Sequence, residues 1–328
     1  MNIFIIGGTG FLGYHTALEA LRRGYAVTAL GLPPVPQDET FTRNVRVIIK
    51  SLEQTSDDEL CELMTGHDAL VFAAGADDRF LPPKPAYPYF HHGNVEVTQR
   101  VLSIAKRAGV KRAVILGSYF AHFNRLWSHL ELAQHHPYIR SRVEQEQVCL
   151  ALSTPGFDVM VLELPYIFGS MPGRLPLWTP LIKYIQSTKL LFYMRGGSAC
   201  VSVQTVAEAI LGAIKSGSGR QVYPISDENL TWTEMLTRLA HALGKQIRVI
   251  TLPTWILSIA SWGIWLSRSL QGKEGGLNMK YFASLQTACM FIDPIPAQTA
   301  LGFSIGGLNR SSQDTVSAAS QSPSTENS

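Results

Sequence analysis

Residues 3 to 13 read Ile3-Phe4-Ile5-Ile6-Gly7-Gly8-Thr9-Gly10-Phe11-Leu12-Gly13, which is an apolar run, a glycine-rich turn and the start of a helical pattern. The apolar run predicts a buried β-strand, and the amphipathic pattern of residues 11–23 predicts a helix directly after it. Gly7 permits a tight turn, Gly10 lets a ligand approach the backbone, and Gly13 allows the helix to pack closely on the strand. Because the first turn of a helix has free N–H groups and a positive dipole, this segment predicts a site for the diphosphate of a dinucleotide. A tight turn that binds no ligand is the alternative.

Short β-rich runs alternate with helical patterns through the first half of the chain. Strands are predicted at residues 3–6, 26–30, 45–49, 69–73, 112–116 and 158–162, and helices at residues 11–23, 57–64, 94–108 and 138–152. This alternation is typical of a parallel sheet with crossover helices. We therefore expect an α/β fold, with a Rossmann-like, doubly wound parallel sheet in residues 1–169. A smaller mixed substrate-binding lobe is expected in residues 170–309, with residues 200–226 partly completing the sheet.

The composition is that of an ordinary folded chain. Of 328 residues, 46% are hydrophobic, and 28 basic residues stand against 25 acidic ones. A net charge of +3 without basic runs argues against nucleic acid as a partner. The four cysteines, at positions 61, 149, 200 and 289, lack the spacing of a metal site and predict free thiols in a reducing compartment. Because no signal sequence precedes the first strand, we expect a cytoplasmic protein.

Two segments of unusual composition lie in the second half. Residues 310–328 are rich in Ser, Thr and Gln with almost no bulky apolar residue, so we predict a disordered tail. Residues 254–267 carry no charge and contain Trp255, Trp262 and Trp265. A helix there would reach about 21 Å, less than a bilayer core of about 30 Å, so no transmembrane span is expected. A core helix or pocket wall is the first interpretation, and peripheral contact with a membrane or an apolar partner is the second.

Three further motifs carry a family resemblance. They read Asn94-Val95-Glu96-Val97-Thr98, Leu162-Glu163-Leu164-Pro165-Tyr166-Ile167-Phe168-Gly169, and Val201-Ser202-Val203 followed by Val206-Ala207-Glu208-Ala209. Together with the Gly-x-x-Gly-x-x-Gly spacing of the first turn, they resemble the extended short-chain dehydrogenases/reductases, the family of NAD-dependent epimerases and dehydratases. The resemblance extends from residue 3 to about residue 244 and implies a nicotinamide cofactor, NAD or NADP.

The same resemblance implies a reacting centre. The family uses Tyr-x-x-x-Lys together with a Ser or Thr, and the matching residues here are Tyr138, Arg142 and Ser118. Tyr138 would be the acid/base, Ser118 would orient the substrate oxygen, and Asn94 would be a supporting polar group. Tyr138 and Arg142 are four residues apart, which places them on one face of a helix. Arginine replaces the family's lysine; its charge can still lower the pKa of a tyrosine, although its planar group is bulkier.

The resemblance also implies which residues contact the cofactor. They are Gly7, Thr9, Gly10, Phe11, Leu12, Gly13, Ala73, Ala74 and Pro165. NAD enzymes usually have an acidic residue just after the second strand, and NADP enzymes have an arginine nearby. Here that position is Gly31, so neither signature is present. Arg43 either folds back toward the cofactor or is a solvated loop charge, and NADP is slightly favoured over NAD.

Charged and titratable residues near the expected site suggest two further hypotheses. Glu163 stands where the family often has an arginine, so it would form a compensating pair with Arg140 or Arg142; a surface helix with ordinary charges is the alternative. Six of the nine histidines lie at positions 91, 92, 122, 129, 135 and 136. Their spacing does not match a metal site, so we expect no metal and assign these histidines to the polarity of the substrate cleft.

The predicted function is that of an NAD(P)-dependent oxidoreductase or epimerase of the extended short-chain type. Its substrate would be a small alcohol or ketone, or a sugar nucleotide, bound between the sheet edge and the second lobe. Trp178, Phe192 and Tyr193 favour an apolar substrate, and the scarcity of basic residues between positions 175 and 194 disfavours a nucleotide diphosphate. The alternative is a catalytically weak NAD(P)-binding sensor or assembly protein. A homodimer is left open.

Overall fold

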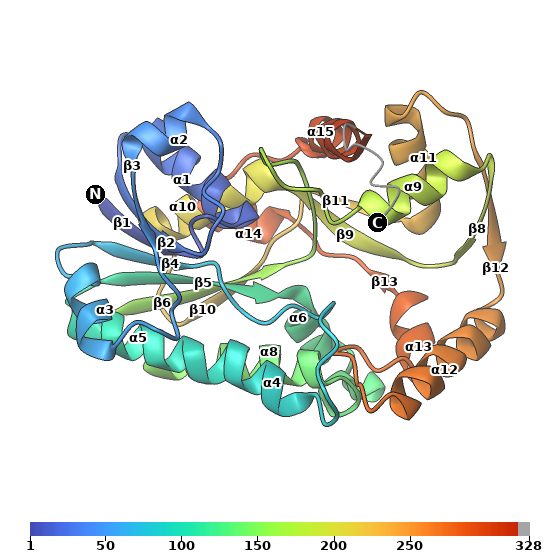
Figure 1. Cartoon of the computed structure of the whole chain (residues 1–328), viewed down its shortest axis with the longest axis horizontal. Coiled ribbons are helices and arrows are strands. Elements are labelled where there is room, and N and C mark those ends of the chain that lie inside the picture. The colour runs from blue at the N-terminus through green and yellow to red at the C-terminus, as the bar shows by residue number, and fades with distance from the viewer. Residues whose placement is uncertain (321–328) are drawn as a thin grey trace.

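The computed structural model describes residues 1–320, which form a large parallel sheet and a smaller second lobe (Figure 1). The large sheet has seven strands: β1 (Asn2–Ile6), β2 (Ala26–Gly31), β3 (Val45–Ile49), β4 (Ala69–Phe72), β5 (Arg112–Ser118), β6 (Asp158–Leu164) and β10 (Gln221–Pro224). Their order is β10-β6-β5-β4-β1-β2-β3, and every neighbouring pair is parallel. The order in which successive strands join the sheet reverses between β1 and β4, and at such a point open sheets bind ligands at the carboxyl ends of the strands. The predicted Rossmann-like, doubly wound sheet is confirmed.

Helices cover both faces of this sheet (Figure 1). On one face lie α1 (Phe11–Arg22), α2 (Glu39–Asn44), α10 (Val203–Ser216) and α14 (Ile295–Leu301), and on the other lie α3 (Asp57–Met64), α4 (Tyr87–His91), α5 (Val97–Arg107) and α8 (Pro137–Leu152). Successive residues of β1 enter opposite cores: Ile3 and Ile5 pack in the core of α1, and Phe4 packs in the core of α3 and α5. Because both faces are covered, the central strands β1 and β4 read in the sequence as almost continuous apolar runs.

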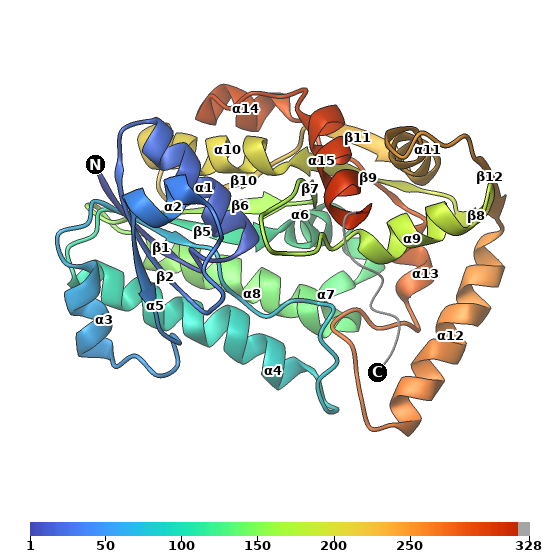
Figure 2. The same cartoon turned by 45° about the horizontal axis from the view of Figure 1, so that its top comes forward.

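The second lobe is built around β9 (Gly197–Ser202). It pairs with β7 (Tyr166–Phe168), β11 (Glu228–Thr231) and β13 (Cys289–Met290), while β8 (Leu190–Met194) and β12 (Arg248–Leu252) form a separate parallel pair. The helices of this lobe are α9 (Thr179–Ser187), α11 (Trp232–Ala242), α12 (Thr254–Leu270), α13 (Phe282–Gln286) and α15 (Leu308–Ser320). Two short helices, α6 (Tyr119–Leu126) and α7 (Leu132–His135), lie where the sheet and the second lobe meet (Figure 2).

The prediction of a disordered tail is wrong for residues 310–320, which belong to α15. Leu308, Val316 and Ala319 are buried against the core of the second lobe. The Thr315 hydroxyl accepts a hydrogen bond from the Gly169 N–H at 2.7 Å. Small hydroxyl residues are buried at low cost when backbone groups satisfy them, which composition alone does not reveal. Residues 321–328 of the predicted tail lie outside the described residues.

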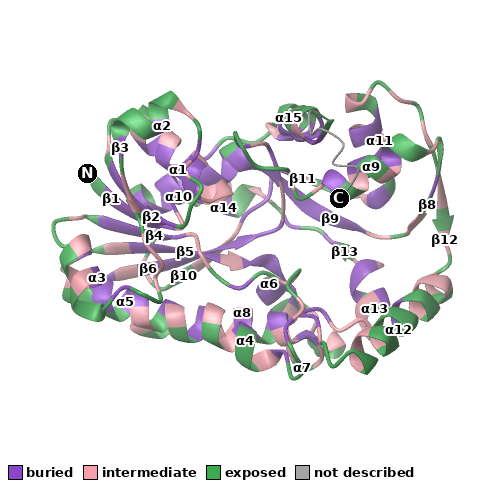
Figure 3. Cartoon of the chain, in the orientation of Figure 1, coloured by how far each residue is buried: buried purple, intermediate pink, exposed green. Residues whose placement is uncertain are grey.

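The tryptophan-bearing segment is helical, as predicted, and forms α12. Its apolar side is exposed, however: Trp255, Ile259 and Trp262 face solvent, whereas Ser261 is buried (Figure 3). The interpretation as a core helix or pocket wall is therefore wrong for this side of the helix. Among residues 1–320, no helix combines the length and apolarity needed to cross a bilayer.

Candidate active site

The turn after β1 is held by close backbone contacts. Gly7 has a φ of +80°, and a Cβ there would lie 2.6 Å from the Ala73 carbonyl oxygen. A Cβ at Gly13 would overlap the Gly7 carbonyl oxygen, so the first turn of α1 packs directly on the loop. Gly10 differs, because its φ of −85° suits any residue and a Cβ there would meet only that same oxygen, at 3.1 Å. The close packing of the turn therefore does not require a glycine at position 10, and the contact of Gly10 with a ligand stays a prediction.

The N-terminus of α1 fits an anionic ligand. Gly10 is the N-cap residue, and within residues 1–320 no side chain caps the helix. The first turn also contains no acidic residue that would repel an anion. Uncapped N–H groups at the positive end of a helix dipole are suited to a phosphate. The residues present therefore fit the diphosphate of a dinucleotide, which the backbone of Gly10, Phe11 and Leu12 would hold.

The end of β2 contains no residue that selects between NAD and NADP. A Cβ at Gly31 would overlap the Thr9 hydroxyl, which explains why a larger residue is absent there. That hydroxyl donates to the Leu32 carbonyl oxygen at 2.7 Å, so Thr9 ties the glycine turn to the end of β2. Arg43 lies on α2 and pairs with Glu39 at 3.1 Å, with both side chains largely exposed. Of the two interpretations of Arg43, the structure matches the solvated charge.

The remaining residues expected to contact the cofactor lie at the same edge of the sheet. Ala73 and Ala74 follow β4, and the Ala73 N–H donates to the Ile6 carbonyl oxygen at 2.9 Å. Pro165 is buried between β6 and β7. The ends of β1, β4 and β6 thus bring these residues to the side on which the glycine turn lies. Their contact with the cofactor stays a prediction.

Ser118, Tyr138 and Arg142 come together at this sheet edge. Ser118 ends β5, whereas Tyr138 and Arg142 lie in the first two turns of α8. The guanidinium carbon of Arg142 is 5.1 Å from the centre of the Tyr138 ring. The guanidinium group donates to the carbonyl oxygens of Leu116 and Ala76, both at 3.4 Å, and to Gln145 Oε1 at 2.9 Å. These bonds fix a cation beside the tyrosine in the place of the family's lysine.

The groups around Tyr138 shift the pKa of its phenol in opposite directions. Burial raises the pKa of the Tyr138 phenol, while the charge of Arg142 and a hydrogen bond with Ser118 lower it. The charge of Asp78 also raises the pKa of this phenol. Burial in turn raises the pKa of the Asp78 carboxyl to about 6. Sequence reasoning missed Asp78, because it lies in the loop after β4 and no motif marks it. A buried phenol beside a fixed cation is an arrangement suited to an acid/base tyrosine.

Asn94 is buried in a single π-helical turn, His92–Glu96, where the sequence predicted the first turn of a continuous α-helix. Its Oδ1 accepts from the Ala76 N–H at 2.8 Å, and its Nδ2 donates to Ser141 Oγ at 3.0 Å. Ser141 Oγ in turn donates to the Tyr138 carbonyl oxygen at 2.7 Å. Asn94 therefore connects the loop after β4 to the helix that carries Tyr138. Such π-turns are frequent at functional sites.

A segment of the second lobe, residues 272–279, covers Tyr138, and sequence reasoning did not find it. The Gly276 carbonyl oxygen accepts from the Tyr138 N–H at 3.0 Å, and a Cβ at Gly276 would lie 2.7 Å from the Tyr138 Cβ. The Asn278 N–H donates to Nδ1 of His136 at 2.9 Å. Burial lowers the pKa of His136 to about 4, so its ring is neutral at pH 7 and able to accept. The adjacent glycines at 275 and 276 are the one signal in the sequence.

The hypothesis that Glu163 pairs with Arg140 or Arg142 is wrong. Glu163 is fully buried, and both of its oxygens accept from Arg125 Nη2 at 2.9 Å. Arg125 also pairs with Glu146 at 2.5 Å. The hypothesis failed because α6 packs against β6 and brings Arg125 to Glu163. A contact between α6 and β6 cannot be predicted from the positions of Arg140 and Arg142 on α8.

The buried Glu163 carboxyl predicts a pH dependence of stability. Burial and the neighbouring Glu146 raise the pKa of Glu163 from its ordinary 4.5 to about 8. The folded protein then retains a proton that the unfolded chain releases, so this group's contribution to the free energy of unfolding falls as the pH rises from about 4.5 to about 8. We expect Glu163→Gln to lose less stability than the wild type between pH 5 and pH 8, measured by urea unfolding. Glu144→Gln, which changes a partly exposed carboxylate on α8, is the control; equal losses in the wild type and Glu163→Gln would contradict the prediction.

The six histidines singled out in the sequence do not form one cluster. His91 and His92 pair with Glu96 at 3.1 and 2.7 Å, and His135 stacks on Tyr281 with the ring centres 3.7 Å apart. Across residues 1–320, no group of three or more His, Cys, Asp or Glu side chains is arranged to hold a metal ion.

Comparison with known proteins identifies relatives of this chain. A 4-hydroxy-2-methyl-3-oxo-4-farnesyl-3,4-dihydroquinoline-1-oxide ketoreductase from Stigmatella aurantiaca is 27% identical over 267 residues, which cover 77% of this chain and 76% of the relative. A decarboxylating sterol-4-alpha-carboxylate 3-dehydrogenase from Homo sapiens is 23% identical over 271 residues, or 77% of this chain and 69% of the relative. This chain is similar to both along most of its length.

A solved structure confirms the architecture. UDP-glucuronic acid 4-epimerase from Bacillus cereus in complex with NAD superimposes with a TM-score of 0.68 at 14% identity, covering 98% of this chain and 99% of that one. The family described as "NAD dependent epimerase/dehydratase family" matches residues 3–225, which is more than half of the chain. The chain therefore belongs to the NAD dependent epimerase/dehydratase family, and it is an enzyme of this NAD(P)-dependent family.

Proposed function

We propose that the protein is a nicotinamide-dependent reductase or dehydrogenase that acts on the carbonyl or carbinol group of a small apolar molecule. One observation carries this proposal: the Tyr138 phenol, the Ser118 hydroxyl and the Arg142 cation lie together at the sheet edge where the glycine turn also lies. In this proposal the phenol is the acid/base, the hydroxyl orients the substrate oxygen, and the cation lies beside the expected cofactor site.

The role of each residue follows from its surroundings. When bound, the nicotinamide cofactor supplies the chemistry of hydride transfer. The Ser118 hydroxyl accepts from the Phe120 N–H at 3.4 Å and forms a hydrogen bond with the Tyr138 phenol, so in this mechanism it turns its proton to the substrate oxygen when the substrate binds. Tyr138 donates its proton to that oxygen as negative charge develops there, or takes the proton back in the reverse direction. Arg142 stabilises the phenolate by its charge.

The substrate class is argued from the second lobe and from the relatives. The Trp178 ring stacks on Phe168 at 4.5 Å and meets Tyr166 edge-on at 5.3 Å, so aromatic rings gather at β7 and the chain that follows it. Residues 175–194 contain only two basic residues, both lysines, which is poorly suited to a nucleotide diphosphate. The names of the two relatives include a farnesyl group and a sterol, both largely hydrocarbon. An apolar ketone or alcohol is therefore favoured over a sugar nucleotide.

For the cofactor we propose NADP slightly ahead of NAD. The end of β2 lacks the carboxylate that would repel a 2′-phosphate, because Gly31 occupies that position. Arg43 does not supply an attraction, since it pairs with Glu39 in solvent. Fluorescence titration with NADPH and NADH measures the preference, and a carbonyl screen with the tighter cofactor then tests the reaction.

Arg142→Met tests the role of the arginine. Removing the cation leaves burial as the dominant influence and raises the pKa of Tyr138 further, so less phenolate forms at neutral pH. We expect the pH profile of kcat for alcohol oxidation to move to higher pH, with kcat at pH 7 about tenfold lower. Arg142→Lys is the matched control, because it keeps the charge and is expected to restore part of the profile. A profile that Arg142→Met leaves in place would remove the arginine from the proposed mechanism.

A second candidate is a binding protein without turnover. The observations that favour it are the arginine in place of lysine and the near-complete burial of Tyr138 beneath residues 272–279. Such a protein would bind NADP(H) tightly and reduce no member of a ketone panel. Wild-type turnover of any ketone excludes it.

A further inference from the structure

The exposed side of α12 is an apolar stripe that no other helix or strand of residues 1–320 covers, although the Lys280 ammonium lies over its Trp262 ring at 5.5 Å. Its members recur at helical spacing and are Trp255, Ile259, Trp262, Leu266 and Leu270, of which Trp255 and Ile259 are 63% and 66% exposed and Leu270 is 80% exposed. Single exposed apolar residues are ordinary, but five in one stripe of a helix mark a contact surface. Figure 2 shows α12 along the outer side of the second lobe, away from the main sheet.

α12 presents large apolar residues to solvent although its inner side is apolar as well, with Ile256, Leu257 and Trp265 half-buried. Ser261 is buried, and the hydroxyls of Ser258 and Ser261 are satisfied within the helix by the carbonyl oxygens of Thr254 and Ser258, at 3.1 Å each. Tryptophan with aliphatic side chains on the outer side is typical of helices that lie in the interface of a bilayer. A helix that lies in the interface does not need the length of a membrane span.

The charges near α12 indicate what kind of surface would bind its apolar stripe. Between residues 235 and 292 the chain has six basic residues and one acidic residue. Arg238 pairs with Glu228 and Lys245 donates to the Ile185 and Gln186 carbonyl oxygens, so the other four cations, Arg248, Arg268, Lys273 and Lys280, are the ones that remain near α12. The one acid, Glu274, accepts from the Ala86 N–H at 2.8 Å and is thus engaged within the protein. Arg248, Lys273 and Lys280 are exposed. A second copy of the chain would present the same basic segment and be repelled, whereas an anionic lipid surface is attracted.

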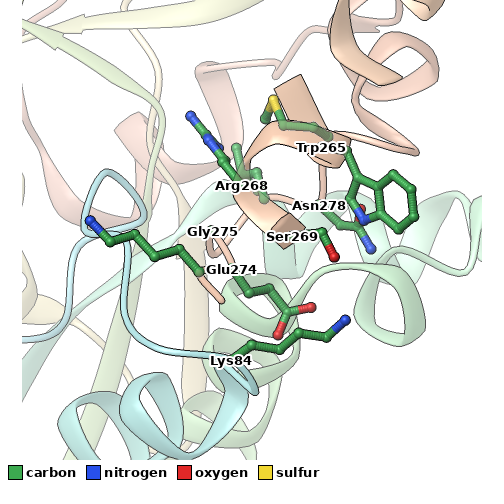
Figure 4. A pocket seen from close by; sticks show the side chains of 10 residues that line it. Lys84, Trp265, Arg268, Ser269, Glu274, Gly275 and Asn278 are labelled. Atoms are coloured by element: carbon green, nitrogen blue, oxygen red, sulfur yellow. The ribbon is translucent and has the colours of Figure 1, made fainter. Parts of the chain in front are cut away.

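Basic side chains gather where α12 ends. Lys84, Arg268 and Lys273 line a small hollow together with Glu274 (Figure 4). The loop before α4 contacts the end of α12 there, because the Lys84 N–H donates to the Gly272 carbonyl oxygen at 2.9 Å. At this end of the helix, cations therefore lie close to the apolar stripe. Apolar side chains flanked by cations match the two layers of a bilayer interface, acyl chains and anionic headgroups.

We propose that α12 docks the protein on the surface of an anionic lipid bilayer, with the apolar stripe in the interface. The segment that follows the helix reaches Tyr138 within six residues, through the Gly276 carbonyl oxygen. Docking therefore places the active site close to the lipid from which an apolar substrate is taken. This consequence for the substrate rests on the proposed function, whereas the docking itself rests on α12 alone.

Vesicle flotation with the full chain tests the docking. Vesicles of phosphatidylcholine with 30% phosphatidylglycerol are expected to carry the wild type, and pure phosphatidylcholine is expected to bind at least about tenfold less. The triple variant Trp255→Ser, Ile259→Ser, Trp262→Ser should bind the anionic vesicles at least about tenfold less than the wild type. The double variant Lys273→Glu, Lys280→Glu should lose binding to a similar extent, and that loss should match the effect of raised salt on the wild type. Ile295→Ser, an exposed apolar residue on α14, is the matched control and should bind normally.

Several outcomes overturn the proposal. Wild-type protein that does not float with anionic vesicles, or a triple variant that floats as well as the wild type, would do so. Sedimentation showing that the triple variant converts a dimer to a monomer, without any vesicle binding, would assign the stripe to an interface between copies. Cofactor titration and reduction of a water-soluble ketone are measured on every variant to establish folding. They also separate the two proposals, because vesicle binding without ketone reduction leaves the docking standing and removes the proposed function.

Discussion

Replacing Tyr138 with phenylalanine is expected to lower kcat for carbonyl reduction by about 1,000-fold while leaving the affinity for the cofactor nearly unchanged. The variant keeps the ring that Arg142 contacts at 5.1 Å and loses only the hydroxyl that exchanges a proton with the substrate oxygen. The Tyr138 backbone is held by Gly276 and Ser141, and neither bond involves the hydroxyl, so the fold around it should persist. Steady-state kinetics and a fluorescence titration with NADPH measure the two effects.

Tyr89→Phe is the matched control, because it removes the hydroxyl of an exposed tyrosine on α4. It should keep wild-type kcat. Retention of more than a tenth of the wild-type kcat by Tyr138→Phe would show that the proton comes from another group. Asp78 would then be the next candidate, since it acts on the same phenol.

The second large effect is expected at the glycine turn, where two substitutions should separate folding from binding. A Cβ at Gly13 would overlap backbone atoms of Gly7 and Gly8, which cannot move aside, so Gly13→Ala should destabilise the fold by about 3 kcal/mol. A Cβ at Gly10 meets only one oxygen at 3.1 Å and has an allowed φ, so Gly10→Ala should fold with nearly normal stability. The same Cβ stands on the side from which the diphosphate approaches, so the cofactor Kd should rise at least about tenfold.

Urea unfolding and fluorescence titration of both variants check this pair. A Gly10→Ala variant that binds NADPH as tightly as the wild type would mean that the cofactor does not lie on the first turn of α1. A Gly13→Ala variant as stable as the wild type would mean that the close packing of the helix on the loop carries little energy.

The parallel sheet was predictable because its central strands are buried on both faces. Phe4 and Ile5 enter different cores, so residues 3–6 of β1 are all apolar and stand out in the sequence. The glycine turn and the four-residue spacing of Tyr138 and Arg142 are local patterns, and the structure places them at one sheet edge. Their functional roles stay predictions.

The parts that sequence reasoning missed depend on contacts between distant segments. Glu163 meets Arg125 because α6 folds over β6, and Tyr138 is covered by residues 272–279, more than 130 positions later. The tail was misjudged because Thr315 is satisfied by Gly169, a partner 146 residues away. On α12 the predicted helix was correct, but an uncharged, tryptophan-bearing sequence does not say which of its residues face the core and which face an external surface.

A crystal structure of the protein grown with saturating NADPH tests the central claim most directly. The account predicts the diphosphate at the start of α1, with its oxygens accepting from the N–H groups of Phe11 and Leu12 and the nicotinamide lying beside Tyr138. A first turn without the diphosphate, or a cofactor bound elsewhere on the chain, would contradict it.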